Sequence, residues 1–275
     1  MRHRLLLCFA FLICAAGCNS SSEHPSETIT LATTTSTRDS GLLDELVPMF
    51  EKQSDIQVKV IAVGTGQALA MGRRGDADVL LTHAPAAEQQ FMDDGHGSDR
   101  WPVMHNDFVL VGPKSNPAGI VVKTNIAEAL RAIRTSQSAF VSRGDDSGTH
   151  MKERAIWKAA SAKPSGDWYI EAGGGMAHTL RLASEKQAYT LADRGTFLAL
   201  KDGLELVVAC EHDPLLRNPY AVILVNQQNH PHIKHHAARK LAEFLISASA
   251  QEQIRTFGVT KYGQPLFFPL ERPED

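Results

Sequence analysis

Cysteine is scarce in this chain, and its placement excludes a fold held together by disulfides. Only four of the 275 residues are cysteines. Cys8 and Cys14 lie in an apolar run near the N-terminus, Cys18 follows that run closely, and Cys210 stands alone. A single remaining cysteine cannot form an internal disulfide. We therefore expect the mature chain to be held by hydrophobic cores.

A basic stripe is also lacking. The chain has 28 Lys and Arg residues against 31 Asp and Glu residues, a net charge of −3, and no Lys/Arg-rich run with interleaved aromatic residues. We therefore expect no nucleic-acid partner, and any anion site must be built locally. The composition, 43% hydrophobic and 21% charged, is that of a globular protein long enough for two medium domains.

The N-terminus is typical of an export signal. A basic start precedes the apolar run Leu5–Ala16, which is too short to span a bilayer as a helix. The run ends in Ala15-Ala16-Gly17-Cys18, which resembles a lipoprotein cleavage box. We expect residues 1–17 to be a signal peptide, Cys18 to carry a lipid anchor and the Ser-rich segment 18–27 to be a flexible tether. An ordinary secretory signal cut nearby is the alternative, and both place the protein outside the cytoplasm.

Strand-like and helix-like segments alternate along the rest of the chain. This order favours an α/β fold with a parallel sheet covered by helices. Strands are expected at 29–32, 56–63, 77–81, 108–111, 139–141, 189–191, 204–209 and 220–225. Helices are expected at 42–50, from about 68, at 86–93, 126–133, 151–160 and 177–185, from 193, and over an amphipathic stretch at 235–257.

Four loops that follow strands share one composition: hydroxyl groups, glycines, one arginine and few carboxylates. They are Thr33–Ser36, Gly64–Gln67, Arg143–Thr149 and Gly173–Met176. Ligands of open α/β sheets bind beyond the carboxyl ends of the strands. A deprotonated tetrahedral oxyanion has only acceptors, so its pocket needs hydroxyl, backbone N–H and guanidinium donors, and glycine lets the backbone approach closely. The loops therefore predict an oxyanion site.

Each loop also has a purely structural interpretation. Ser and Thr residues routinely cap helices, the glycines are compatible with a tight turn or a linker, and Arg143 has Asp145 and Asp146 nearby as structural salt-bridge partners. The same carboxylates would suit a phosphate that carries a proton, so these residues leave phosphate open.

Two local patterns bear on catalysis and on metal binding. Gly144–Gly148 resembles the nucleophile segment of trypsin-like proteases, but it contains an extra Asp, the chain is α/β, and no oriented base is evident for Ser147. We therefore expect no enzyme activity. His230, His232, His235 and His236 do not have a standard metal-ligand spacing, so we expect no metal site there.

Taken together, the motifs resemble the extracytoplasmic tungstate-binding proteins of ABC importers, from about Thr28 to Val225. The motifs are Ala32–Thr37, Asp39–Leu43, Val63–Leu69, Gly75–Leu81, His83–Ala86, Asn106–Phe108, Ser142–His150, Gly175-Met176, Ala183–Lys186 and Tyr189–Thr196. One departure is Ala177-His178, where the family has a Gly directly after the Met.

The resemblance implies a two-lobed type II periplasmic binding-protein fold, with a ligand cleft between the lobes and two crossing strands. Lobe 1 would comprise 28–109 plus 221–275, and lobe 2 would comprise 110–220. It implies no metal cofactor, a monomer, and an ABC permease with its ATPase as partners. The implied ligand-binding residues are Thr34, Thr35, Ser36, Thr65, Arg143, Ser147, Thr149, Gly175 and Met176.

The resemblance also selects the ligand. Tungstate and molybdate share shape and charge, so the choice of tungstate rests on the family alone. Alternatives are molybdate, a phosphate- or sulfate-type oxyanion, or an anion-sensing lipoprotein without a transport role.

Overall fold

The computed structural model describes residues 27–121, 124–145 and 147–269. The expected signal peptide, Cys18 and nearly all of the tether lie outside these residues, as does Asp146. Within the described ranges, no helix has the length and apolar character needed to cross a membrane.

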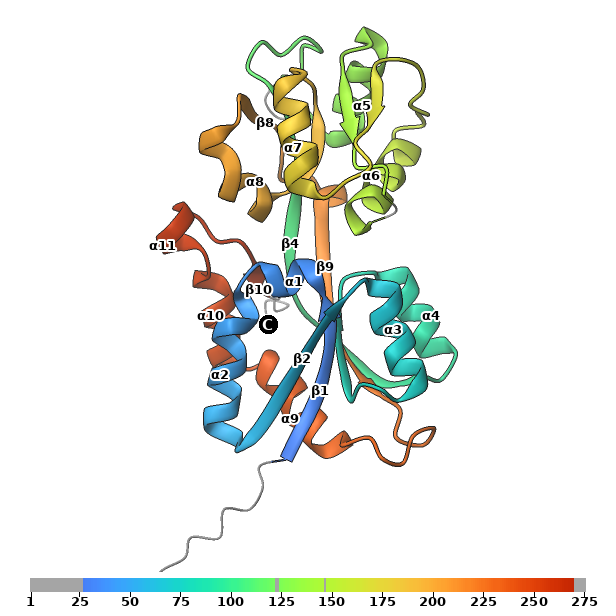
Figure 1. Cartoon of the computed structure of the whole chain (residues 1–275), viewed down its shortest axis with the longest axis vertical. Coiled ribbons are helices and arrows are strands. Elements are labelled where there is room, and N and C mark those ends of the chain that lie inside the picture. Colours follow the sequence, from blue (N-terminus) through green and yellow to red (C-terminus); the bar gives the residue numbers. More distant parts are fainter. Residues whose placement is uncertain (1–26, 122–123, 146, 270–275) are drawn as a thin grey trace, which may run out of the picture.

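The first lobe is built on a sheet whose parallel strands each lead into a helix (Figure 1). β1 pairs in parallel with β2 on one side and β3 on the other. β3 has four buried residues, as a central strand covered on both faces requires. The strands are β1 (Glu27–Thr34), β2 (Ile56–Val63) and β3 (Val79–Thr82), and the helices are α1 (Thr35–Asp39), α2 (Leu42–Ser54), α3 (Thr65–Arg74) and α4 (Pro85–Asp93).

Two long strands, β4 (Gly97–Pro113) and β9 (Arg217–Val225), run between the lobes (Figure 1). Residues 97–107 of β4 pair antiparallel with β9. From Phe108 onward β4 pairs instead with β7 (Thr190–Asp193) and β8 (Leu206–Cys210). The expected strand at 108–111 is thus only the apolar end of β4. Its polar first part, such as His105-Asn106-Asp107, has no alternating pattern and forms a strand because β9 supplies the pairing.

The second lobe continues from these strands. β5 (Phe140–Ser142) pairs in parallel with β6 (Tyr169–Glu171), and Phe140 bridges to Tyr189 next to β7. The helices of this lobe are α5 (Ile126–Ser136), α6 (Gly148–Ala159), α7 (Met176–Glu185) and α8 (Arg194–Leu200), with 3-10 turns at Lys201–Gly203 and Pro214–Leu216.

The C-terminal segment differs from the expected single helix at 235–257. It forms α9 (His235–Leu245) and α10 (Ala248–Thr256), followed by α11 (Val259–Tyr262) and β10 (Phe268–Pro269). Ser247 separates the two longer helices and caps the second, because its side chain accepts the backbone N–H of Ala250. The apolar periodicity continues through this break and hides it.

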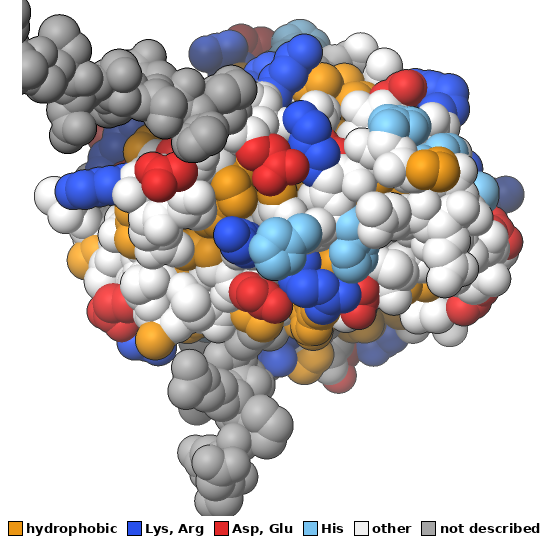
Figure 2. Space-filling model, turned by 90° about the horizontal axis from the view of Figure 1, so that it is seen from below, with side chains coloured by type: hydrophobic (Ala, Val, Ile, Leu, Met, Phe, Trp, Pro, Cys, Tyr) orange, Lys and Arg blue, Asp and Glu red, His pale blue; other side chains and the backbone are white. Residues whose placement is uncertain are grey.

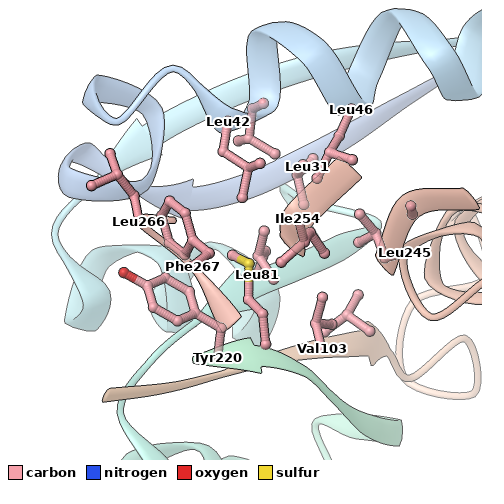
Figure 3. Packing of buried hydrophobic residues seen from close by; sticks show 14 of the residues in the cluster. Leu31, Leu42, Leu46, Leu81, Val103, Tyr220, Leu245, Ile254, Leu266 and Phe267 are labelled. Carbon is pink, nitrogen blue, oxygen red and sulfur yellow. The ribbon is translucent and has the colours of Figure 1, made fainter. Parts of the chain in front are cut away.

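One hydrophobic cluster extends from the first lobe along β4 into α7 and α8 of the second lobe, and another lies within the second lobe. In the first lobe Leu31 and Leu81 of the sheet pack against Leu245 and Ile254 of the C-terminal helices, beside Phe267 (Figure 3). The second-lobe cluster contains Phe140, Trp157 and Tyr189. Burial of each such side chain stabilises the fold by about 1.5–3 kcal/mol. Cys210 is buried in this second cluster and is not in a disulfide.

The lower end of the first lobe carries a mixture of charges. Viewed from below, Lys and Arg side chains alternate with Asp, Glu and His side chains, and no continuous basic surface forms on this face (Figure 2). His230 and His232 of this lobe place their Nε2 atoms 3.0 and 2.9 Å from the carbonyl oxygens of Arg73 and Gly75. Among the described residues, no group of three or more His, Cys, Asp or Glu side chains is placed to hold a metal ion.

Candidate functional site

A hydroxyl cluster forms where β1 ends. Thr34 is buried and caps α1, and its Oγ1 accepts the backbone N–H of Thr37 at 3.3 Å. The same oxygen lies 3.1 Å from Ser36 Oγ and 2.6 Å from Thr37 Oγ1. Thr35 and Ser36, in the first turn of α1, are exposed. The loop therefore does cap a helix, and it also leaves hydroxyl groups at the open edge of the sheet.

Two neighbouring strands bring further groups to this edge. Thr34 lies beside Val63 in the β1–β2 register, so Thr65, the first residue of α3, follows at the same level. Thr33 lies beside Leu81 in the β1–β3 register, which places His83 close to Thr34. The Nε2 atom of His83 is 3.2 Å from Thr34 Oγ1 and 3.4 Å from Ser36 Oγ.

His83 is absent from the ligand-binding residues predicted from the sequence. The sequence does contain a signal for His83, because His83 directly follows β3 as Thr35 directly follows β1, and the ends of parallel strands share one edge. Its loop, Thr82–Pro85, contains no glycine and only one hydroxyl residue, so it lacks the composition that marks the other four loops.

In the second lobe, Arg143 and Ser147 flank a tight turn between β5 and α6. Arg143 donates to one carboxylate oxygen of Asp145, and the backbone N–H of Ser147 donates to the other at 3.2 Å. Ser147 caps α6 by accepting the backbone N–H of His150 at 3.4 Å, and Thr149 is buried in the first turn. Ser147 is therefore placed as a capping hydroxyl group.

The charge of Asp145 is fixed by these contacts. Burial would raise the pKa of its carboxyl group, but hydrogen bonds from Ser147 and Arg143 outweigh burial, and the pKa lies below its usual value. Asp145 is thus an ionised turn residue with a hydrogen bond to each oxygen, as the salt-bridge interpretation of this turn predicts.

The Arg143 guanidinium still has an unused donor. Its side chain is only 17% exposed, and its Nε atom is buried without a hydrogen-bond partner. Among the described residues, this is the one buried side-chain nitrogen or oxygen atom that lacks a hydrogen-bond partner. An unsatisfied buried donor costs about 1–3 kcal/mol, and an acceptor supplied from outside the chain would remove that cost.

The glycine-rich loop is attached to the Arg143 turn. The backbone N–H groups of Ala172 and Gly173 donate to the carbonyl oxygens of Ser142 and Arg143 at 2.8 and 2.9 Å. Gly175 then caps α7, and Met176 is buried as its first residue. The loop that leads into α7 is therefore bonded to the turn that leads into α6, and the first N–H groups of each helix lack intrahelical partners.

The two halves meet at His83. A Cβ atom built on Gly148, the first residue of α6, would lie 3.5 Å from His83 Cε1. The structure therefore brings together Thr34 and Ser36 from one lobe with the α6 turn that carries Ser147 and Arg143 from the other. The other predicted ligand-binding residues lie at or next to the first residue of a helix, and the helix fixes their positions: Thr35, Thr65, Thr149, Gly175 and Met176.

Known proteins are similar to this chain in sequence and in fold. A family model described as a PBP superfamily domain matches residues 19–249. A tungstate-binding protein TupA from Peptoclostridium acidaminophilum is 47% identical over 271 residues, covering 96% of this chain and 95% of that protein.

Solved structures agree. The tungstate-binding protein TupA from Desulfovibrio alaskensis G20 is 42% identical with a TM-score of 0.84, covering 90% of this chain and all of that one. A tungstate ABC transporter structure from Geobacter sulfurreducens is 48% identical with a TM-score of 0.74, covering 83% and 97%. The fold is the type II binding-protein fold expected from the sequence, and the chain belongs to the PBP superfamily, in the family of the tungstate-binding proteins TupA.

Proposed function

We propose that this protein captures tungstate between its lobes and delivers it to an ABC import permease. The observation that carries the proposal is the buried, unpartnered Nε–H of Arg143. Arg143 lies in the turn that precedes Gly148, and Gly148 faces His83, which lies beside the hydroxyl cluster of the other lobe. The names of the similar proteins support tungstate as the anion.

The donor set favours an anion without a proton. A protonated phosphate needs an acceptor in its pocket, and each oxygen of Asp145 has one acceptor site occupied, by Arg143 or by Ser147. The exposed hydroxyl groups of Thr35 and Ser36 and the guanidinium of Arg143 suit an anion that only accepts. This chemistry favours tungstate, molybdate or sulfate over protonated phosphate, and the preference for tungstate within that group rests on the relatives.

Binding follows from the division of the donors between two lobes. The anion meets the hydroxyl groups of the first lobe, and closure adds Arg143 and the helix starts of the second lobe. Closure also removes water, so each charge-assisted bond strengthens as the local dielectric constant falls. No bond in the anion is made or broken, so the protein acts as a receptor and not as an enzyme.

The setting is extracytoplasmic. The sequence of residues 1–27 supports export, a lipid on Cys18 and a tether to the membrane, from which a monomer would reach its permease. Lobes of 28–109 plus 221–275 and of 110–220 fit the change of strand partners on β4 after Asp107. The anion is the ligand, and the proposal includes no other cofactor.

The test is a calorimetric titration of the mature protein with tungstate, molybdate, sulfate, phosphate and chromate. Perchlorate, a tetrahedral anion with a single charge, is the control for shape without the second charge. We expect one-to-one binding, tightest for tungstate, and no measurable heat from perchlorate. Tightest binding of phosphate, or no binding of any of these anions, would contradict the proposal.

A further inference from the structure

The turn that carries His83 is fixed on both sides by one buried carboxylate. Thr82 Oγ1 and the backbone N–H of Ala84 both donate to Oε1 of Glu88, each at 2.8 Å. Arg100 donates to the other oxygen of Glu88 at 3.1 and 2.7 Å. Since the residues on either side of His83 are bonded to the same group, the backbone at His83 is held in place.

The imidazole ring is also oriented by its neighbours. Asn218 donates its amide N–H to Asn106 at 2.8 Å, which leaves Asn218 Oδ1 as the acceptor for Nδ1–H of His83 at 3.1 Å. The ring packs against Tyr220, with 4.7 Å between ring centroids. With the proton on Nδ1, the Nε2 atom of neutral His83 is an acceptor, and it faces the hydroxyl groups of Thr34 and Ser36.

The remaining edge of the ring faces the second lobe. Gly148 has no side chain, and a Cβ atom there would be in ordinary van der Waals contact with His83 Cε1, at 3.5 Å. His83 thus contacts the hydroxyl cluster through Nε2 and the crossing strand β9 through Nδ1, and its Cε1 edge faces the start of α6.

We propose that His83 is a positioning residue for the anion: its Nε2 atom accepts the Thr34 hydroxyl hydrogen, which leaves the nearby Ser36 hydroxyl hydrogen for the anion, and its ring is the surface on which the start of α6 closes. This inference rests on the proposed function. The proposal gives the His83 side chain two separate roles: the Nδ1 contact with Asn218 stabilises the fold, and the Nε2 contact prepares the site for the ligand.

Two variants distinguish these roles. In His83→Gln the amide group takes the place of Nε2 and keeps an acceptor for the Thr34 hydroxyl group. In His83→Asn the amide group takes the place of Nδ1 and keeps only the contact with Asn218. His212→Gln, at an exposed histidine with a side chain 73% accessible, is the matched control. Each protein is titrated calorimetrically with tungstate, and its folding is checked by urea unfolding.

We expect His83→Gln and the control to bind tungstate within about threefold of the parent protein. We expect His83→Asn to bind at least tenfold more weakly while unfolding at a urea concentration no lower than that of His83→Gln. Equal affinities for the two His83 variants, or tighter binding by His83→Asn, would overturn the role of Nε2. A parent protein that gives no heat with tungstate would instead contradict the proposed function, and with it this inference.

Discussion

Behind Arg143, the side chain of Glu153 is almost fully enclosed on the inner side of α6. Its carboxyl group accepts hydrogen bonds from Ser142 at 2.8 Å, from Trp157 at 3.2 Å and from Tyr169 at 2.7 Å. Burial raises the pKa of this carboxyl group, although the three donors act in the opposite direction. Glu153 therefore fixes the residue that precedes Arg143 and carries a pH dependence of its own.

The sign of that dependence follows from linkage. An acid whose pKa is higher in the folded state binds its proton more tightly there, so its contribution to stability is complete below about pH 4.5 and is lost as pH rises through the folded pKa. As pH rises from 4.5 to 8, we expect the free energy of unfolding of Glu153→Gln to increase relative to that of the parent, because the variant has no group at this position that can ionise. Urea unfolding at several pH values measures this, with Glu243→Gln, at an exposed glutamate, as control. Parallel pH curves for Glu153→Gln and the parent would refute it.

At the scale of elements, β4 is held at its change of partners by a buried ion pair. Arg194, the first residue of α8, donates to both oxygens of Asp107 at 2.8 and 2.6 Å, and the two side chains are only 5% and 8% exposed. Arg194 also pairs with Glu211 at 2.7 Å. The pair joins the second lobe to the strand that crosses from the first.

Removing Asp107 would leave a buried guanidinium with one partner. We expect Asp107→Ala to lower the free energy of unfolding by about 3 kcal/mol. Glu205→Ala, which removes a partner of Lys114 in a pair 65% and 72% exposed, is the control and should cost less than about 1 kcal/mol. Urea unfolding of the three proteins compares them, and equal losses in the two variants would show that burial of the pair does not matter.

Elements with a clear local pattern could be predicted, and those defined by a distant partner could not. The bounds of β2 follow from the sequence alone, because Ile56–Val63 is a continuous β-favouring run. The first part of β4 does not, because its residues become a strand only by pairing with β9, more than a hundred positions away. The division between α9 and α10 is hidden because Ser247 acts as a cap within an unbroken apolar period.

The candidate site shows the same division. Gly, Ser, Thr and Arg residues after strands identify the loops, and the family resemblance selects Thr34 and Arg143 among them. No sequence pattern indicates the distance between Gly148 and His83, because that contact depends on how the lobes face each other. The partnerless Nε of Arg143 is likewise visible only in three dimensions.

At the scale of the whole molecule, two crossing strands connect two lobes that each carry half of a donor set (Figure 1). In the proposed function both halves are needed, because the first lobe would supply neutral hydroxyl groups and the second would supply the guanidinium. The central claim is therefore that both halves act on one anion and that Arg143 supplies its main charged contact.

The measurement that tests this claim most directly is the affinity for tungstate of Arg143→Ala, by calorimetric titration beside the parent protein. Arg134→Ala, at an exposed arginine on α5, controls for the loss of one positive charge. Loss of a buried charge-assisted contact costs about 2–4 kcal/mol, so we predict that Arg143→Ala binds at least about thirtyfold more weakly and that Arg134→Ala binds like the parent. An affinity of Arg143→Ala within twofold of the parent would contradict the account.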